Sequence, residues 1–116
     1  MGEIHVKFRI YSGERFTELE GLVDTGATFT KIPRSAASKI GLRAIYEAEV
    51  MLGDGRSLKR DLALGEVEVE GVKRPILIAI GGDEETPIIG YITLEVLGFK
   101  VNPLTGKLER TPAIEL

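Results

Sequence analysis

The chain has 116 residues, the size of one domain, and its 43% hydrophobic and 28% charged residues are typical of a water-soluble globular protein. It contains no cysteine and one histidine, His5, which excludes disulfides and thiolate catalysis and leaves too few ligands for a zinc site. A net charge of −3 without a basic run argues against nucleic acid as a partner. The polar N-terminus and the lack of any membrane-length apolar run predict a cytoplasmic protein with no membrane partner.

Two strands are predicted before the most informative motif. Apolar and polar residues alternate over residues 4–10, as in a half-buried strand. Residues 12–14 (SGE) predict a turn, after which residues 15–23 return as a second strand. The second strand leads directly into Asp24, and an acid at the end of a buried strand is costly unless something stabilises it or uses it.

A short helix and two hairpins are predicted in the middle of the chain. Residues 34–40 (RSAASKI) are rich in alanine, with Pro33 where a first helical turn begins and Gly41 just after the end. The triplet Gly53-Asp54-Gly55 is a strong hairpin signal, because Asp-Gly supports the positive φ angles of tight turns. A second hairpin is predicted around Gly71. The predicted strand pairs are residues 47–52 with 56–62 and residues 66–70 with 72–80.

The C-terminal part continues the pattern of short elements. A polar loop over residues 81–85 (GGDEE) precedes a short buried strand over 87–90 and a second helix over 91–97, which Gly98 ends. A last hairpin is predicted around the segment PLTG, between residues 99–102 and 107–110. Many short strands with close turns indicate an all-β fold, a small closed barrel, in a single domain over residues 1–116.

Several kinds of chemistry are excluded by the residues that are missing. A Ser-His-Asp triad needs a histidine near a nucleophile elbow, and the sequence has no G-x-S-x-G. The glycines of LGDGRS lie between predicted strands, so they indicate a hairpin tip rather than a phosphate loop at a helix start. Carboxylate chemistry remains, and Asp24 is its candidate.

Two carboxyl groups about 3 Å apart cannot both ionise, so their pKa values separate and the pair shares one proton. One carboxylate can then activate a water while the protonated partner polarises a peptide carbonyl. In the motif Asp24-Thr25-Gly26, the glycine leaves room for a tight turn that brings a backbone N–H near the carboxylate.

The segment VDTGATFTKIP resembles the active-site segment of the retropepsin-type, single-domain aspartic proteases. Further elements follow in that family's order over residues 3–102: RSAASKIG as the helix, MLGDGRSL as a flap hairpin, VEVEGVKRPILIAI as a second hairpin, and PIIGYITLEVLG as a strand and helix. The resemblance implies a small closed acid-protease barrel with a flap hairpin and one or two short helices. It also implies an aspartic endopeptidase that acts on extended peptides and needs neither a cofactor nor a metal.

The resemblance implies roles for two groups of residues. The catalytic residues would be Asp24, Thr25 and Gly26, with the Thr25 hydroxyl reaching toward a partner chain. The substrate would lie against Ala27, Thr28 and the hairpin tip Gly53, Asp54 and Gly55. Two plainer interpretations stay open: the Gly-Asp-Gly tip is a simple turn, and Thr28 and Thr30 are ordinary strand residues.

The sequence supplies one aspartate in such a setting. The other three, Asp54, Asp61 and Asp83, fall in a hairpin tip, a strand and a polar loop. A two-fold homodimer supplies the second carboxyl, because a residue near the axis meets its own copy. One departure concerns that dimer: many relatives carry an Arg directly after the apolar-apolar-Gly element, and this chain has Tyr91-Ile92-Thr93. The C-terminal segment LERTPAIEL is a candidate strand for a shared sheet, although Pro112 disfavours a long one.

Two other functions remain open at this point. The fold could serve as a non-catalytic peptide-binding or dimerisation module, or the protein could process only itself or a single partner.

Overall fold

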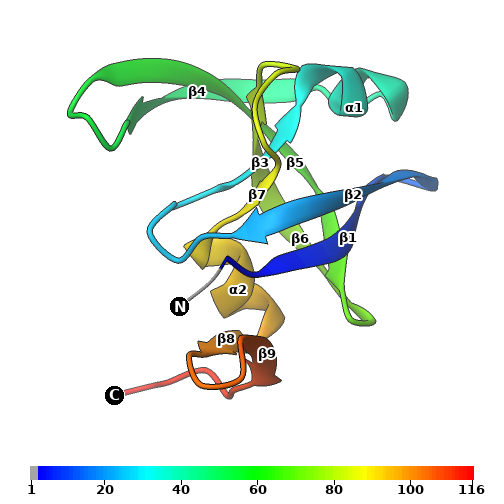
Figure 1. The fold of residues 1–116 in the computed structure, drawn as a ribbon. Helices are drawn as coiled ribbons and strands as arrows, with labels where there is room; N and C mark the ends of the chain where they lie inside the picture. The colour runs from blue at the N-terminus through cyan, green and yellow to red at the C-terminus, as the bar shows by residue number, and fades with distance from the viewer. Residues whose placement is uncertain (1–2) are drawn as a thin grey trace.

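The computed structural model describes residues 3–116, which form nine strands and two short helices (Figure 1). The elements in chain order are β1 (His5–Ser12), β2 (Arg15–Val23), β3 (Thr30–Pro33), α1 (Arg34–Lys39), β4 (Ala44–Met51), β5 (Ser57–Val69), β6 (Val72–Gly81), β7 (Ile88–Ile89), α2 (Tyr91–Leu97), β8 (Phe99–Asn102) and β9 (Lys107–Arg110). Strands dominate, which confirms the predicted all-β acid-protease-like fold. Neither helix is long and apolar enough to cross a membrane in the part of the chain that the structure describes.

Seven strands form one sheet that closes on itself. Their order is β1-β2-β7-β3-β6-β5-β4, and β1 also pairs with β5, so six of them make a ring. The fourth strand pairs only with β5 and lies outside the ring, and together they form a long hairpin that projects from the body (Figure 1). The small β8–β9 sheet lies at the opposite end of the molecule (Figure 1). The ring therefore holds a projecting hairpin at one end and a separate two-stranded sheet at the other.

Alternate residues of the ring strands point inward and make the core. Phe8 and Ile10 of β1 are buried, as are Ile32 of β3 and Ile78 of β6. The helices close the ends of this core with their apolar faces: α1 buries Ala36 and Ala37, and α2 buries Leu94 and Leu97. Burial of this apolar surface is the main stabilising term for a ring of short strands.

Several predicted boundaries are confirmed. The first two strands pair in antiparallel register from His5–Leu22 to Ser12–Arg15, around the predicted turn. The second helix ends at Gly98, whose φ of 78° is the left-handed conformation that glycine adopts most easily. The last hairpin pairs β8 with β9 around the predicted PLTG turn.

Two predicted features are wrong. The predicted strands 56–62 and 66–70 are one strand, β5, of 13 residues. The glycine between them, Gly65, lies within this continuous strand. A larger residue would not fit there, because a Cβ would lie 2.8 Å from the carbonyl oxygen of Tyr11 on the crossing strand β1. It is a point of close backbone approach. Pro33 is the last residue of β3 and the N-cap of α1, with a ψ of 148°, and does not begin the first helical turn.

Candidate active site

Asp24 follows the last residue of β2 and opens a tight loop beside β7. Its backbone N–H donates to the carbonyl of Ile89 at 3.0 Å, which continues the parallel pairing of β2 with β7 by one residue. The loop then turns back, because the N–H of Ala27 donates to the Asp24 carbonyl at 3.1 Å. The N–H of Gly26 donates to the Asp24 carboxyl oxygen Oδ1 at 2.9 Å. The half-buried carboxylate is thus held by the loop that it begins.

The start of α2 holds the other end of this loop. The first N–H groups of a helix have no partner within the helix. Here the N–H of Tyr91 donates to the carbonyl of Ala27 at 2.7 Å, and that of Ile92 donates to the carbonyl of Thr28 at 3.1 Å. Gly90 precedes them, and a Cβ on it would lie 2.4 Å from the carbonyl oxygen of Phe29. The apolar-apolar-Gly element therefore packs its backbone directly against the backbone of the loop.

Two buried threonines link β3 to α2 behind the loop. The side-chain oxygens of Thr30 and Thr93 are 2.5 Å apart, and Thr30 Oγ1 also accepts the N–H of Gly90 at 3.1 Å. Both residues are fully buried. The sequence pattern is compatible with Thr30 as an ordinary strand residue and indicates no role for Thr93. Their pairing depends on β3 meeting α2, which no local pattern reveals.

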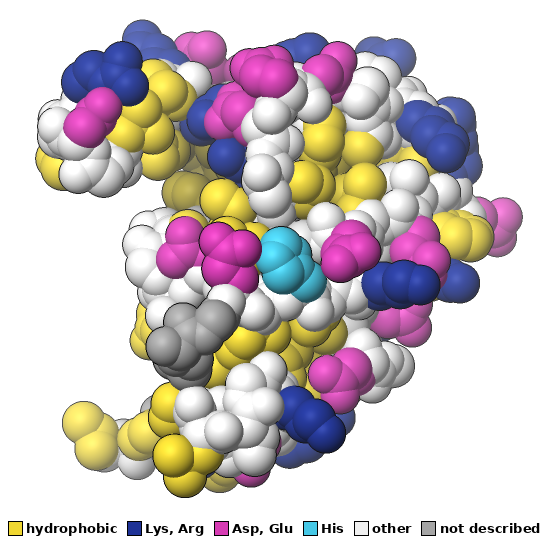
Figure 2. All heavy atoms as spheres, viewed as in Figure 1, with side chains coloured by type: hydrophobic (Ala, Val, Ile, Leu, Met, Phe, Trp, Pro, Cys, Tyr) yellow, Lys and Arg dark blue, Asp and Glu magenta, His cyan; other side chains and the backbone are white. Residues whose placement is uncertain are grey.

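The loop forms the floor of a cleft that the β4–β5 hairpin covers. Figure 2 shows the molecule hollowed on the side where the hairpin overhangs the body. The cleft has a volume of about 630 Å³, in the range of small-molecule and peptide sites. Its lining comprises Asp24, Gly26, Ala27, Thr28, Phe29, Lys31, Glu49, Val50, Met51, Leu52, Gly53, Arg60, Ala79 and Ile88. The structure thus brings Asp24, Gly26, Ala27, Thr28 and Gly53 together around one cavity.

The remaining residues of the hairpin tip form its turn and do not line this cleft. The N–H of Gly55 donates to the carbonyl of Leu52 at 3.0 Å, and Gly55 has a φ of 88°, the one left-handed residue of this turn. The Asp54 carboxylate accepts both the backbone N–H of Arg56 at 3.0 Å and its side-chain Nε–H at 2.7 Å. Asp54 and Gly55 therefore shape the tip in this conformation.

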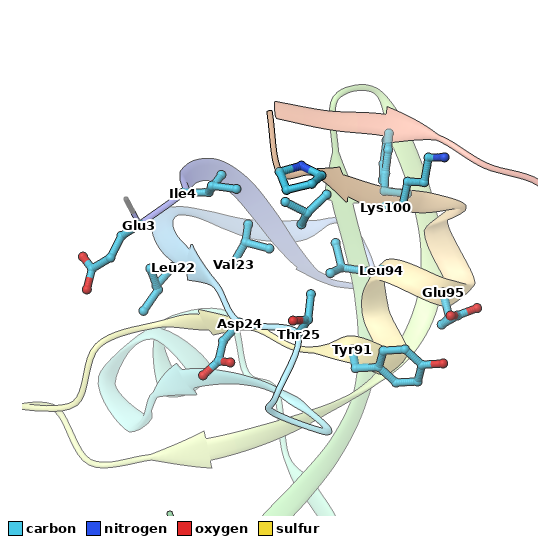
Figure 3. A pocket seen from close by; sticks show the side chains of 13 residues that line it. Glu3, Ile4, Leu22, Val23, Asp24, Thr25, Tyr91, Leu94, Glu95 and Lys100 are labelled. Atoms are coloured by element: carbon cyan, nitrogen blue, oxygen red, sulfur yellow. The ribbon is translucent and has the colours of Figure 1, made fainter. Parts of the chain in front are cut away.

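A second hollow, of about 690 Å³, lies on the other side of the active-site loop (Figure 3). Thr25 lines it, and its wall is mostly apolar, with Ile4, Val23 and Leu94 facing one another. The Asp24 carboxyl points away from this apolar group (Figure 3). The exposed ring of Tyr91 stands at its edge near Glu95, which raises the pKa of the Tyr91 hydroxyl by hydrogen bonding. Asp24 thus lies between a covered cleft and an open apolar hollow.

An ion cluster that no local sequence pattern indicates links Lys31 of β3 and Arg60 of β5 through Glu85. Glu85 accepts two hydrogen bonds from the guanidinium of Arg60, at 2.9 and 2.5 Å, and one from Lys31 Nζ at 3.0 Å. The backbone N–H of Gly82 donates to the same carboxylate at 2.6 Å. These donors, Arg60 first, lower the pKa of Glu85 to about 2 although partial burial opposes the shift.

This pKa predicts how Glu85 contributes to stability as the pH changes. A carboxyl whose pKa is lowered by folding stabilises the protein above its ordinary pKa of 4.5, and this contribution declines as the pH falls toward 2. In Glu85→Gln we expect a loss on the order of 2 kcal/mol of unfolding free energy at pH 7, since the pair is partly solvated. Urea unfolding at pH 7, 5 and 3 measures it. A difference between wild type and variant that does not shrink from pH 5 to pH 3 would contradict the assignment.

Asp24 is the one carboxyl group on the loop of residues 24–27. Within residues 3–116, the one hydrogen bond to the Asp24 carboxyl comes from Gly26, and no three His, Asp or Glu side chains are grouped to hold a metal ion. A family model described as aspartyl protease matches residues 6–94, which include the Asp24 loop, the β4–β5 hairpin and the start of α2. No curated protein matches the chain.

Proposed function

Because this chain belongs to the retropepsin-like aspartyl protease family, we propose that it is a homodimeric aspartic endopeptidase in which each subunit contributes one Asp24. The observation that carries the proposal is the position of Asp24. It lies in a hydrogen-bonded loop on the floor of a covered cleft, and the same loop borders an open apolar hollow. A second copy placed on the hollow side would bring its own loop to this one.

In the proposed mechanism the two Asp24 carboxyls share a single proton. The ionised carboxylate takes a proton from a bound water, whose oxygen attacks the peptide carbonyl carbon, while the protonated carboxyl donates to the carbonyl oxygen. The tetrahedral intermediate then collapses: the C–N bond breaks, the carboxyl that took the proton from water donates it to the leaving nitrogen, and the hydroxyl on the former carbonyl oxygen returns its proton to the other Asp24 as the carbonyl re-forms. The Gly26 N–H occupies one oxygen of Asp24, Oδ1, at 2.9 Å, and this leaves Oδ2 for the water or the partner.

An extended peptide suits the proposed cleft. Strand β4 of the hairpin lies outside the ring, and its free edge offers backbone groups that can pair with a substrate as an added strand. The inward positions Val50 and Leu52 and the floor residue Ile88 give the cleft apolar surface for substrate side chains.

The proposed dimer face is the hollow of Figure 3 with its surroundings. Tyr91 is half exposed there, and the C-terminal residues Ile114 and Leu116 are almost fully exposed. Such apolar groups are costly in water and stabilise an interface when a partner covers them. Residues 111–116 have no regular structure in the single chain, so a strand in a shared sheet stays a proposal for the dimer.

The test measures assembly and hydrolysis together. We expect the specific activity on a peptide library to rise with protein concentration, in step with the dimer fraction found by sedimentation. The reason is that a monomer holds only half of the dyad. A chain that stays monomeric at the highest concentration and yet cleaves peptides overturns the shared dyad. A dimer that binds peptides but cleaves none supports a non-catalytic peptide-binding module instead.

A further inference from the structure

Lys31 lies on the cleft floor among small and apolar neighbours. It pairs in register with Ala79 of β6 on one side and with Ile88 of β7 on the other, and all three line the cleft. Its strand neighbours Thr30 and Ile32 are fully buried in the core, so strand alternation directs Lys31 to the cleft face. An ammonium group is an unusual component of an otherwise apolar floor.

Arg60 approaches the same place from the hairpin. It pairs with Ala48, and alternation puts it on the inward face of the hairpin with Val50. Glu49 also borders the cleft, but its register partner is Lys59, so its side chain belongs to the outward face. The positive charge of Arg60 on the inward face is therefore not balanced by Glu49, which faces outward.

Glu85 holds the two cations without neutralising both. It lies outside the cleft lining and pairs with both Arg60 and Lys31, so the cluster has two positive charges and one negative charge. An ammonium has three N–H donors and a guanidinium has five, and Glu85 takes one and two of these. Within the described residues no other partner binds either head group. Both side chains are largely buried, with 19% and 14% exposed, so their unused donors are only weakly screened by water.

We propose that this cleft selects a substrate carboxylate, and that Lys31 with Arg60 binds an acidic side chain close to the scissile bond. The inference rests on the proposed protease function and adds the class of substrate. A carboxylate that enters the cleft completes the cluster with charge-assisted hydrogen bonds, whereas an amide of the same size leaves the second positive charge unpaired. A terminal carboxylate has the same chemistry, so the test separates the two sources.

The test compares peptides that differ by one group. A set of decapeptides blocked at both ends carries Glu or Gln at each position in turn, and a matching set has a free C-terminus. We expect kcat/KM to be roughly tenfold higher for Glu than for Gln at one position of the blocked peptides. A preference confined to peptides with a free C-terminus would assign the cluster to terminal carboxylates and overturn the side-chain proposal.

Variants connect the preference to the cluster. Lys31→Met keeps the length of the side chain and removes its charge, and we expect it to reduce the Glu/Gln ratio of kcat/KM severalfold. Lys59→Met, on the outward face of the same hairpin, is the matched control and should keep the ratio. A Lys31→Met protein that loses rate equally on both peptides would show a structural role only and overturn the proposal. Thermal unfolding checks that Lys31→Met folds. If Lys31→Met does not fold, the same comparison is made with Lys31→Gln.

A binding measurement keeps the two proposals separable. Fluorescence anisotropy with labelled Glu and Gln peptides is measured on wild type and on Asp24→Asn. Hydrolysis of both peptides at equal rates leaves the protease function standing and removes the acidic preference. Preferential binding of the Glu peptide without hydrolysis supports the preference and removes the protease function. Equal binding without hydrolysis contradicts both.

Discussion

Asp24→Asn is expected to lower kcat/KM on any peptide that the wild type cleaves by about 10³-fold or more, since general acid–base catalysis alone contributes about 10²–10⁴. The substitution keeps the size of the side chain and its ability to accept the Gly26 N–H at 2.9 Å. It removes the only titratable group of the loop, so the proposed dyad of two Asp24 carboxyls could neither hold a shared proton nor deprotonate water. The loop geometry should therefore survive while the chemistry is lost.

The matched control for this variant is Asp61→Asn. Asp61 pairs with the exposed Arg34 at 3.1 Å on β5, outside the cleft lining, and solvated ion pairs contribute little to stability. The peptidase activity of the Asp61→Asn variant should therefore match that of the wild type. Equal hydrolysis by Asp24→Asn and wild type would contradict the assignment of Asp24 as the catalytic acid, and contaminating proteases are then excluded by an inhibitor series.

Gly90→Ala is expected to cost about 3 kcal/mol or more of unfolding free energy, at the upper end for overpacking. Gly90 has a φ of −91°, which any residue adopts, so the cost is steric. The added Cβ would lie 2.4 Å from the carbonyl oxygen of Phe29 and 3.0 Å from that of Ala27. Both atoms belong to a backbone held by hydrogen bonds to α2, so the loop itself has to move. A loop moved by even 1 Å misplaces the Asp24 carboxyl, and activity should fall with stability.

Thermal unfolding at one protein concentration measures this effect, with an expected decrease in Tm of about 10 °C or more. Gly53→Ala is the control for stability: no atom lies within 4 Å of a Cβ there, so its Tm should stay close to that of the wild type. A Gly90→Ala protein with unchanged Tm would show that the loop has more room than the contacts indicate.

Local patterns in the sequence were sufficient to predict most of the strands and helices and the Asp24 loop at the centre of the candidate site. The alternation in β1, the glycine that ends α2 and the Asp-Gly turn of the hairpin are signals carried by a few adjacent residues. The Asp24-Thr25-Gly26 motif is equally local, because the turn that holds the carboxylate is closed by residues 24–27 themselves. This motif carried the family resemblance and the order of the other elements supported it, and the family match over residues 6–94 confirms it.

Contacts between distant segments could be obtained only from the tertiary structure. Gly65 has the local signature of a strand break, and only the crossing of β1 over β5 shows why the strand continues through it. The pairing of Thr30 with Thr93 needs β3 beside α2. The cluster of Lys31, Arg60 and Glu85 needs a strand, a hairpin arm and a loop brought together beside the cleft. Sequence periodicity determines which way a side chain faces on its own strand. The charge of a cleft depends instead on which strands become neighbours, and the closure of the ring decides which strands those are.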